Sequence, residues 1–179
     1  MIILVGPSAS GKTEVAKILG SKYQIKKVIT HTTRPMRPGE VNGVDYHFVS
    51  VERFLLLKKE NAFVETTFYN HNYYGTAKKD LAIDKVLIVD PNGLSAFQEL
   101  HDPNIIAFFL DSTNETRYER MLSRGDSISE AKKRIANDAI SFASDKLTNI
   151  NYIIDSETQN LDQIAKQVYT LYFSHFEKK

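Results

Sequence analysis

The sequence lacks several features that would point to particular classes of protein. It contains no cysteine, so disulfides and thiolate metal sites are excluded. The 23 basic and 22 acidic residues leave a formal net charge of +1, which provides no general field for nucleic acid or an anionic membrane. No apolar run approaches the ~20 residues of a membrane helix, and residues 2–5 are too few for a signal peptide. We therefore expect a cytoplasmic protein that binds neither nucleic acid nor membrane.

The apolar content is sufficient for one core. With 179 residues and 42% hydrophobic content, we expect a single domain spanning residues 1–179. Short β-branched runs alternate with helical patterns, which favours a parallel sheet flanked by helices. The expected strands are 2–5, 27–30, 86–90, 105–110 and 152–155, and the expected helices are 12–19, 95–100, 114–124 and 160–176.

Two segments interrupt this alternation. Between residues 30 and 80 the pattern changes to short alternating pieces at 46–49, 62–68 and 72–74, joined by a helix-like stretch at 51–60. We interpret it as a small excursion from the main sheet. The second break, at 125–129, is short, polar and flanked by arginines, and can act as a hinge.

Residues 6–13, GPSASGKT, fit the phosphate-loop pattern G-x-x-x-x-G-K-[ST]. The segment follows an expected strand and opens an expected helix, which is the context that the mechanism requires. Small residues let backbone N–H groups converge on phosphate oxygens at the helix N-terminus, while a lysine adds positive charge and a hydroxyl can bind Mg²⁺. We therefore expect nucleoside triphosphate binding by Gly6, Ser8, Ser10, Gly11, Lys12 and Thr13, with Thr13 as the metal ligand.

A second candidate anion site lies in the loop that carries Arg34 and Arg37. Prolines next to these arginines fix φ and lower the entropic cost of presenting both guanidinium groups together. Paired guanidinium forks suit a phosphate monoester. Two loop arginines are nevertheless more often solvated surface charge, so this pair does not by itself identify a substrate.

The stretch 31–50, HTTRPMRPGEVNGVDYHFVS, closely resembles the GMP-binding segment of guanylate kinases. The likeness continues at 63–65, FVE, and at 72–76, NYYGT; it is strongest over residues 1–80 and moderate through Arg134. It implies a P-loop NTPase-type α/β fold with an inserted NMP-binding subdomain at 31–80 and a lid at 124–137. The core would then comprise 1–30, 81–123 and 138–179.

The same resemblance implies transfer of the γ-phosphoryl group of ATP to GMP, and to dGMP, with Mg²⁺, by a monomer or homodimer. The GMP phosphate would be held by Arg34, Arg37, Tyr46 and Tyr74, and its base would be surrounded by Thr30, Glu65, Thr76 and Asp90; Gly75 would be a further substrate-binding residue. Guanine offers two adjacent donors, N1–H and the 2-amino group, and one carboxylate such as Glu65 can accept from both. Adenine has no such pair, so AMP would leave buried polar groups unpaired. Asp90 could instead reach Mg²⁺, or cap a helix before Pro91.

A third group of basic residues accompanies the hinge. Arg117, Arg120 and Arg124 fall on one helical face. The motif Arg124-Gly-Asp-Ser resembles the entrance of the guanylate kinase lid, and Lys133-Arg134 resembles its far side. Arg124 and Arg134, with Lys12 and Arg34, would neutralise charge on the transferring phosphoryl group. We interpret the other arginines of this face as surface charge.

Three positions depart from the family pattern. Ile88 stands where the first of two aspartates is usual, Ser141 replaces an acidic residue after the second lid arginine, and Asp155 replaces an asparagine near the adenine pocket. Metal positioning and adenine contacts are therefore expected to differ, or another phosphate donor is used.

Two alternative functions stay open. One is a related P-loop kinase for another phosphorylated small molecule, against which Glu65, Thr30 and Thr76 argue. The other is a guanylate-kinase-like module that binds a phosphorylated peptide. The intact GKT of residues 11–13 argues against that reading, because such modules tend to lose a working phosphate loop.

Overall fold

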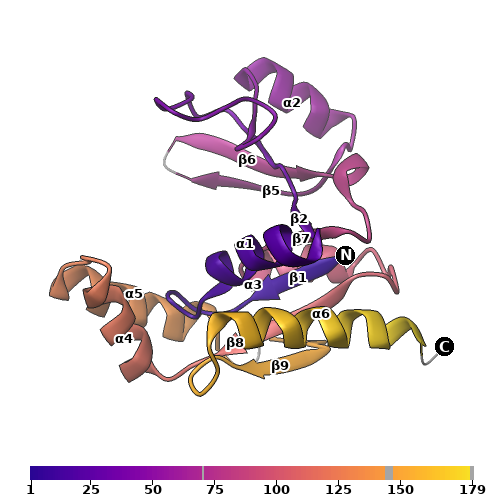
Figure 1. The fold of residues 1–179 in the computed structure, drawn as a ribbon. Helices are drawn as coiled ribbons and strands as arrows, with labels where there is room; N and C mark the ends of the chain where they lie inside the picture. The colour runs from indigo at the N-terminus through magenta and orange to yellow at the C-terminus, as the bar shows by residue number, and fades with distance from the viewer. Residues whose placement is uncertain (70, 144–146, 178–179) are drawn as a thin grey trace. The chain divides into compact units, whose positions relative to one another are not determined.

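The computed structural model describes residues 1–69, 71–143 and 147–177. The chain forms two compact units (Figure 1), one of residues 1–27 with 83–179 and the other of residues 28–82. The second unit encloses the predicted NMP-binding subdomain, 31–80. The predicted core and lid fall almost entirely in the first unit.

The first unit is built on a five-stranded sheet of order β2-β7-β1-β8-β9. Its strands are β1 (Ile2–Val5), β2 (Lys26–Lys27), β7 (Lys85–Ile88), β8 (Ile106–Asp111) and β9 (Tyr152–Asp155). All four neighbouring pairs are parallel, which confirms the predicted sheet type. The predicted strand 27–30 is wrong beyond its first residue, because the chain enters the second unit at Val28.

Helices accompany this sheet: α1 (Lys12–Tyr23), α3 (Pro91–Gln98), α4 (Asn114–Ser123), α5 (Ile128–Ser141) and α6 (Leu161–Glu177). Four of them were predicted with shifted ends, and α3 begins at Pro91 because Asp90 caps it. Helix α5 was not predicted. Its start is nevertheless encoded locally, since Ser127 and Glu130 form a reciprocal capping box.

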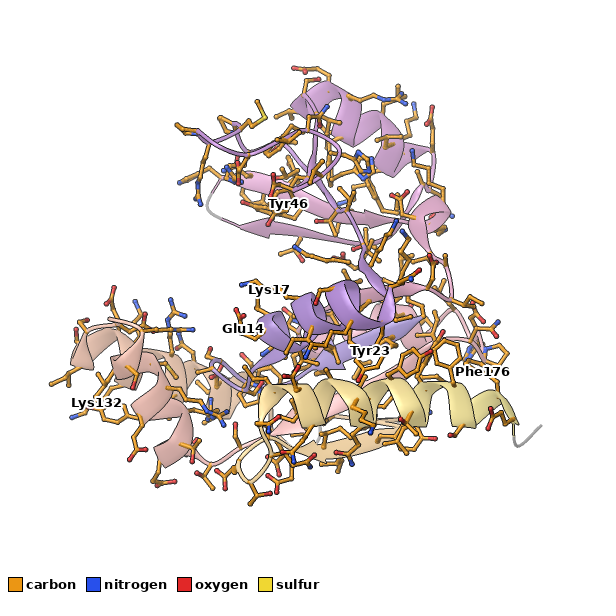
Figure 2. All side chains as sticks on the ribbon, viewed as in Figure 1. Glu14, Lys17, Tyr23, Tyr46, Lys132 and Phe176 are labelled. Carbon is orange, nitrogen blue, oxygen red and sulfur yellow. The ribbon has the colours of Figure 1, made fainter. Side chains whose placement is uncertain are left out.

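The core of the first unit is centred on β1, whose four residues are all fully buried. Ile2 and Leu4 pack with residues of α1 and α6, and the alternation of a strand directs Ile3 and Val5 to the opposite face. Burial on both faces is typical of parallel strands. Tyr23, labelled in Figure 2, stacks on Tyr169 of α6 with ring centroids 4.5 Å apart. These contacts fix the carboxyl end of β1, where residues 6–13 begin.

The second unit contains a four-stranded sheet of order β4-β3-β6-β5. Its elements are β3 (His31–Thr32), β4 (His47–Phe48), α2 (Val51–Lys59), β5 (Phe63–Tyr69), β6 (Asn72–Ala77) and the 3-10 turn η1 (Lys78–Asp80). A separate small core holds it together. Phe54 of α2 is fully buried, and its ring stacks on Phe63 at 4.6 Å and on Tyr73 at 5.3 Å.

Because the second unit has its own small aromatic core, we predict that truncating Phe54 destabilises this unit. Phe54→Ala should destabilise the second unit by about 3–5 kcal/mol, because few other buried apolar groups can compensate for the cavity. Hydrogen exchange should accelerate across residues 28–82 and not in α1, α6 or β1. Leu55→Ala on the same helix is the control, since Leu55 is 44% exposed. Equal loss of protection in both units would show that they do not have separate cores.

Candidate functional site

The loop between β1 and α1 has a backbone that only certain residues can adopt. A Cβ on Gly6 would lie 2.7 Å from the carbonyl oxygen of Leu110 and 2.9 Å from Oγ of Ser10, so no larger residue fits. Ala9 has φ 61° and Gly11 has φ 93°, both in the left-handed region. Because Gly11 provides no side-chain cap, the first N–H groups of α1 are directed to an external acceptor. A capless helix N-terminus of this kind favours an anion.

The side chain of Lys12 lies over this loop. Its Nζ donates to the carbonyl oxygens of Gly6 and Pro7 at 2.6 and 2.7 Å and to Oγ of Ser10 at 3.3 Å. Burial lowers the pKa of Lys12 from 10.5 to about 8, an effect that Asp138 partly opposes. Thr13 follows in the first turn of α1 and is exposed. Lys12 and Thr13 are therefore the first two residues of α1, next to its N–H groups that have no side-chain cap.

A pocket of about 830 Å³ adjoins the loop within the first unit. Its volume is in the range of small-molecule sites. One wall is formed by residues 11–14, another by Arg120 and Arg124, and a third by residues 159–162. The pocket therefore combines cations with the apolar side chains of Ile18, Leu161 and Ile164.

Asp155 shapes the segment next to this pocket. Its carboxylate accepts a hydrogen bond from the N–H of Glu157 at 2.7 Å and another from the hydroxyl of Thr158, which closes a turn after β9. These hydrogen bonds hold the pKa of Asp155 below its usual range. Asp155 is thus a turn-forming residue in this chain. The pocket residues Gln159 and Asn160, which follow the turn, were missed by sequence reasoning because no motif marks them.

The connection between α4 and α5 brings both predicted lid arginines to one carboxylate. Arg124 donates to Oδ2 of Asp126 through Nη2 at 2.6 Å and Nε at 3.1 Å, and Nε of Arg134 lies 4.0 Å from the same oxygen. The hydrogen bond from Arg124 lowers the pKa of Asp126. Gly125, with φ 96°, makes the turn between them. Asp126 is a further residue of this cluster that had been given no role.

The prediction that Arg117 and Arg120 are surface charge is wrong. Arg117 is only 4% exposed, and its Nη1 donates to Oδ2 of Asp138 in α5 at 2.6 Å. Arg120 donates to the carbonyl oxygen of Ala9 at 3.3 Å and also to that of Ser156. The face of α4 that carries both arginines packs on the phosphate loop and on α5, and so it is not solvated. Ser8, a predicted nucleotide contact, directs its N–H and hydroxyl to Asp138.

Asp90 caps α3, as one of its alternatives anticipated, by accepting a hydrogen bond from the N–H of Gly93 at 2.8 Å. The register that pairs Leu4 with Ile88 places Asp90 beside the start of the phosphate loop, at the same edge of the sheet. Ile88 packs against the main core. Asp90 is therefore an acidic residue at the start of the loop, in the same unit as Thr13, in addition to Asp138, which binds Ser8.

The second unit gathers most of the predicted phosphate-holding residues. The guanidinium of Arg34 lies 5.5 Å from the ring centroid of Tyr46, and the rings of Tyr46 and Tyr74 are 6.2 Å apart. Nη2 of Arg34 donates to Oε1 of Glu40 at 2.6 Å, and the backbone N–H of Arg37 donates to Oε2 at 2.7 Å. Glu40, which was not predicted, thus orients Arg34. The side chain of Arg37 is exposed on the same loop.

The predicted base-reading residues include one direct pair. Glu65 and Thr76 face each other in the register of β5 and β6, and Oγ1 of Thr76 donates to Oε1 of Glu65 at 2.7 Å. Thr76 is 1% exposed, whereas Glu65 is half-buried, so the donor side of this hydrogen bond is shielded from water. Thr30 lies beside β4, where its carbonyl oxygen accepts from the N–H of His47 at 2.9 Å. A Cβ on Gly75 would approach the rings of Phe54 and Phe63 to 3.0 Å, so packing explains this glycine.

Two features are absent from the described residues, 1–69, 71–143 and 147–177. No helix in them is both long and apolar enough to cross a membrane. No group of three or more His, Asp or Glu side chains in them is arranged to hold a metal ion.

The central parallel strand, the glycine loop with Lys12 and the capless helix beside a nucleotide-sized pocket define a P-loop nucleotide-binding protein of the α/β class. A sequence profile described as guanylate kinase matches residues 1–174. The chain belongs to the guanylate kinase family.

Individual relatives agree with this assignment. A guanylate kinase of Legionella pneumophila (strain Paris) is 31% identical over 154 residues, which is 82% of this chain and 72% of the relative. One of Chromohalobacter salexigens is 33% identical over 147 residues, covering 78% and 68% of the two chains. The crystal structure of guanylate kinase from Anaplasma phagocytophilum has the same fold, with a TM-score of 0.67 at 23% identity over 97% of this chain and 84% of its own.

The lowered pKa of Lys12 predicts that the affinity for ATP depends on pH. If the charged form of Lys12 binds phosphate, as the sequence predicts, affinity for ATP should be full below about pH 8 and should fall as pH rises further, by up to about tenfold per pH unit. The dissociation constant, measured by calorimetry from about pH 7 to about pH 10, reports this loss. Lys12→Ala should bind more weakly and lose the inflection. A wild-type profile that stays flat through this range would contradict the assignment of Lys12 to phosphate.

Proposed function

We propose that this chain is an ATP- and Mg²⁺-dependent guanylate kinase that phosphorylates GMP and dGMP to their diphosphates. The family assignment supports the reaction, and the Glu65–Thr76 pair is the observation that carries the choice of substrate. The cytoplasmic location and the state of monomer or homodimer stay predictions from the sequence.

The Glu65–Thr76 pair suits guanine for a chemical reason. The hydroxyl of Thr76 donates to Oε1 of Glu65 and so orients the carboxylate, a group that can accept more than one hydrogen bond on each of its oxygens. Guanine N1–H and the 2-amino group are two such donors at the right separation for one carboxylate. Adenine, cytosine and uracil do not present this pair on their pairing edges. Their binding would remove water from Glu65 without replacing all of the hydrogen bonds that the carboxylate loses.

The phosphate of GMP is assigned to Arg34, Arg37, Tyr46 and Tyr74. The guanidinium of Arg34 is held beside Tyr46 by Glu40, and two tyrosine hydroxyls add neutral donors. A phosphate monoester accepts charge-assisted hydrogen bonds from such groups. This set contacts a part common to all nucleoside monophosphates, and so it supplies affinity without selecting the base.

The triphosphate of ATP is assigned to residues 6–13. Nζ of Lys12, which donates to three oxygens of its own loop, would turn to the phosphates, and the N–H groups at the start of α1 would point at them. The adenosine would lie in the pocket lined by Arg120, Arg124 and Asn160. Thr13 would hold Mg²⁺, with Asp90 as the carboxylate of the site, and the bound ion would neutralise phosphate charge during transfer. One hydroxyl and one carboxylate fit the few protein ligands that Mg²⁺ takes in nucleotide sites.

The lid arginines act on the charge that develops during transfer. Arg124 lies at the edge of the nucleotide pocket and shares Asp126 with Arg134. The ion pair between Arg124 and Asp126 is exposed, so exchanging the carboxylate for a phosphate oxygen costs little. The GMP phosphate oxygen attacks the γ-phosphorus directly, and no covalent intermediate with a side chain is required.

Two substitutions separate base reading from phosphate holding. Glu65→Gln keeps the size of the side chain but offers one guanine donor an N–H, so kcat/KM for GMP should fall by roughly 10- to 150-fold, which corresponds to a loss of about 1.5–3 kcal/mol. Rates with AMP or CMP should barely change. Arg37→Ala should instead lower kcat/KM for every monophosphate by similar factors, and the preference for guanine should survive.

The measurement is diphosphate formation from each common monophosphate with ATP or GTP, with and without Mg²⁺, for both variants and the wild type. An equal effect of Glu65→Gln on all substrates would rule out its role in reading the base. Equal turnover of AMP and GMP by the wild type would contradict the proposed function itself.

A further inference from the structure

Asp138 occupies an unusual place for a carboxylate. It lies in the last turn of α5 and is only 9% exposed. Both of its oxygens accept hydrogen bonds from one residue of the phosphate loop: Oδ2 from the backbone N–H of Ser8 at 2.8 Å and Oδ1 from the Ser8 hydroxyl at 3.2 Å. The end of α5 is thereby attached to the loop that precedes α1, although the two residues are 130 positions apart.

This position is unfavourable for an isolated carboxylate. An acidic side chain near a helix C-terminus opposes the helix dipole, and a buried charge loses its hydration. Arg117 of α4 compensates, because its Nη1 donates to Oδ2 of Asp138 at 2.6 Å. A buried pair of this kind is weak evidence for stability, since apolar residues of similar volume often serve as well. A contribution to stability is therefore not enough to explain why Arg117 and Asp138 are buried together beside the phosphate loop.

The loop residues held by this pair are those with the least favourable backbone. Ala9, which follows Ser8, has φ 61° without being glycine. Such a left-handed residue costs roughly 1–2 kcal/mol and persists only where its surroundings impose it. Nη1 of Arg117 also donates to the carbonyl oxygen of Ser8 at 3.4 Å, and Arg120 donates to that of Ala9 at 3.3 Å. Ser8 is thus held through its N–H, its hydroxyl and its carbonyl oxygen.

We propose that Asp138, with Arg117 as its counter-charge, is a positioning residue for the phosphate loop. It fixes Ser8 and the left-handed Ala9, so that the N–H groups of residues 10–13 face the phosphates of the donor nucleotide. The two residues contact no substrate themselves and act through Ser8. The inference rests on the proposed use of ATP as the donor.

Two simpler accounts make different predictions for the same variants. If the pair acts only through its charges, Asp138→Ala should tighten ATP binding by leaving Arg117 unopposed, Arg117→Met should weaken it, and the double variant should resemble the wild type. If the pair is only structural, the double variant should recover both stability and ATP binding. Positioning instead requires that every variant without Asp138 bind ATP less well, because the N–H of Ser8 loses its acceptor.

The test is a comparison of Asp138→Ala, Arg117→Met and the double variant by thermal unfolding, by direct titration with a fluorescent ATP analogue, and by the KM values for ATP and GMP. We expect Asp138→Ala and the double variant to bind the analogue about tenfold more weakly and to have a KM for ATP about tenfold higher. A tenfold change corresponds to the loss of one charge-assisted hydrogen bond. KM for GMP should stay within about twofold of the wild type. The double variant should unfold near the wild-type temperature, so that stability recovers and ATP binding does not.

Tighter or unchanged ATP binding in Asp138→Ala, or normal ATP binding in the double variant, would overturn the proposal. If Asp138→Ala is insoluble, Asp138→Leu replaces it, because leucine is of similar size and has no acceptor: weaker ATP binding is expected, and unchanged or tighter binding would overturn the proposal. Val168→Ala in α6 is the matched control, because Val168 is fully buried in the same core and its truncation should lower stability without changing KM for ATP. Wild-type protein that binds the analogue but does not phosphorylate GMP would contradict the proposed function and leave the test of Asp138 valid.

Discussion

The close approach of the phosphate loop to β8 is the constraint on which the rest of the site depends. Gly6 packs so tightly on Leu110 that a Cβ would lie 2.7 Å from its carbonyl oxygen. The loop therefore follows one narrow route from the central strand to α1, and this route directs the first N–H groups of the helix and Nζ of Lys12 into the same region. The buried β1 strand and the packing of α1 against α6 serve to hold both ends of that route.

The charged pairs of the site fall into two kinds. Arg34 with Glu40 and Arg124 with Asp126 each join residues of one short segment, and Arg124 is 46% exposed. Such local pairs orient an arginine and can be exchanged for a phosphate. Arg117 and Asp138 come from different helices and are buried with the phosphate loop. That pair is not available for exchange, and its effect on a ligand passes through the backbone of Ser8.

Local signals in the sequence were enough to predict the phosphate loop, the parallel sheet and most of the helices. The pairing of Glu65 with Thr76 was also within reach, because it follows from a family segment with both residues at fixed places. The strand at 27–30 was overextended because its apolar pattern continues after the chain has left the sheet. Helix α5 was not predicted although Ser127 and Glu130 mark its start, because the capping box lies within a short polar segment that resembles a hinge.

Arg117 and Arg120 show that a local sequence pattern does not reveal contacts with distant parts of the chain. Arg117 and Arg120 lie on a polar helical face, which is ordinarily solvated. Arg117 is buried against Asp138, 21 residues away, and both arginines donate to loop carbonyl oxygens more than a hundred residues away, those of Ser8 and Ala9. No spacing rule within one helix contains that information.

Transfer of the γ-phosphoryl group from ATP to a guanine nucleotide can be followed by tracing the γ-phosphate. Wild-type protein would be incubated with Mg²⁺, GMP and ATP labelled with ³²P at the γ-position, and the products would be separated. We expect the label to appear in the β-phosphate of GDP in step with ADP formation, with little released as inorganic phosphate. Label found chiefly in inorganic phosphate, or transferred equally to AMP and CMP, would contradict this expectation.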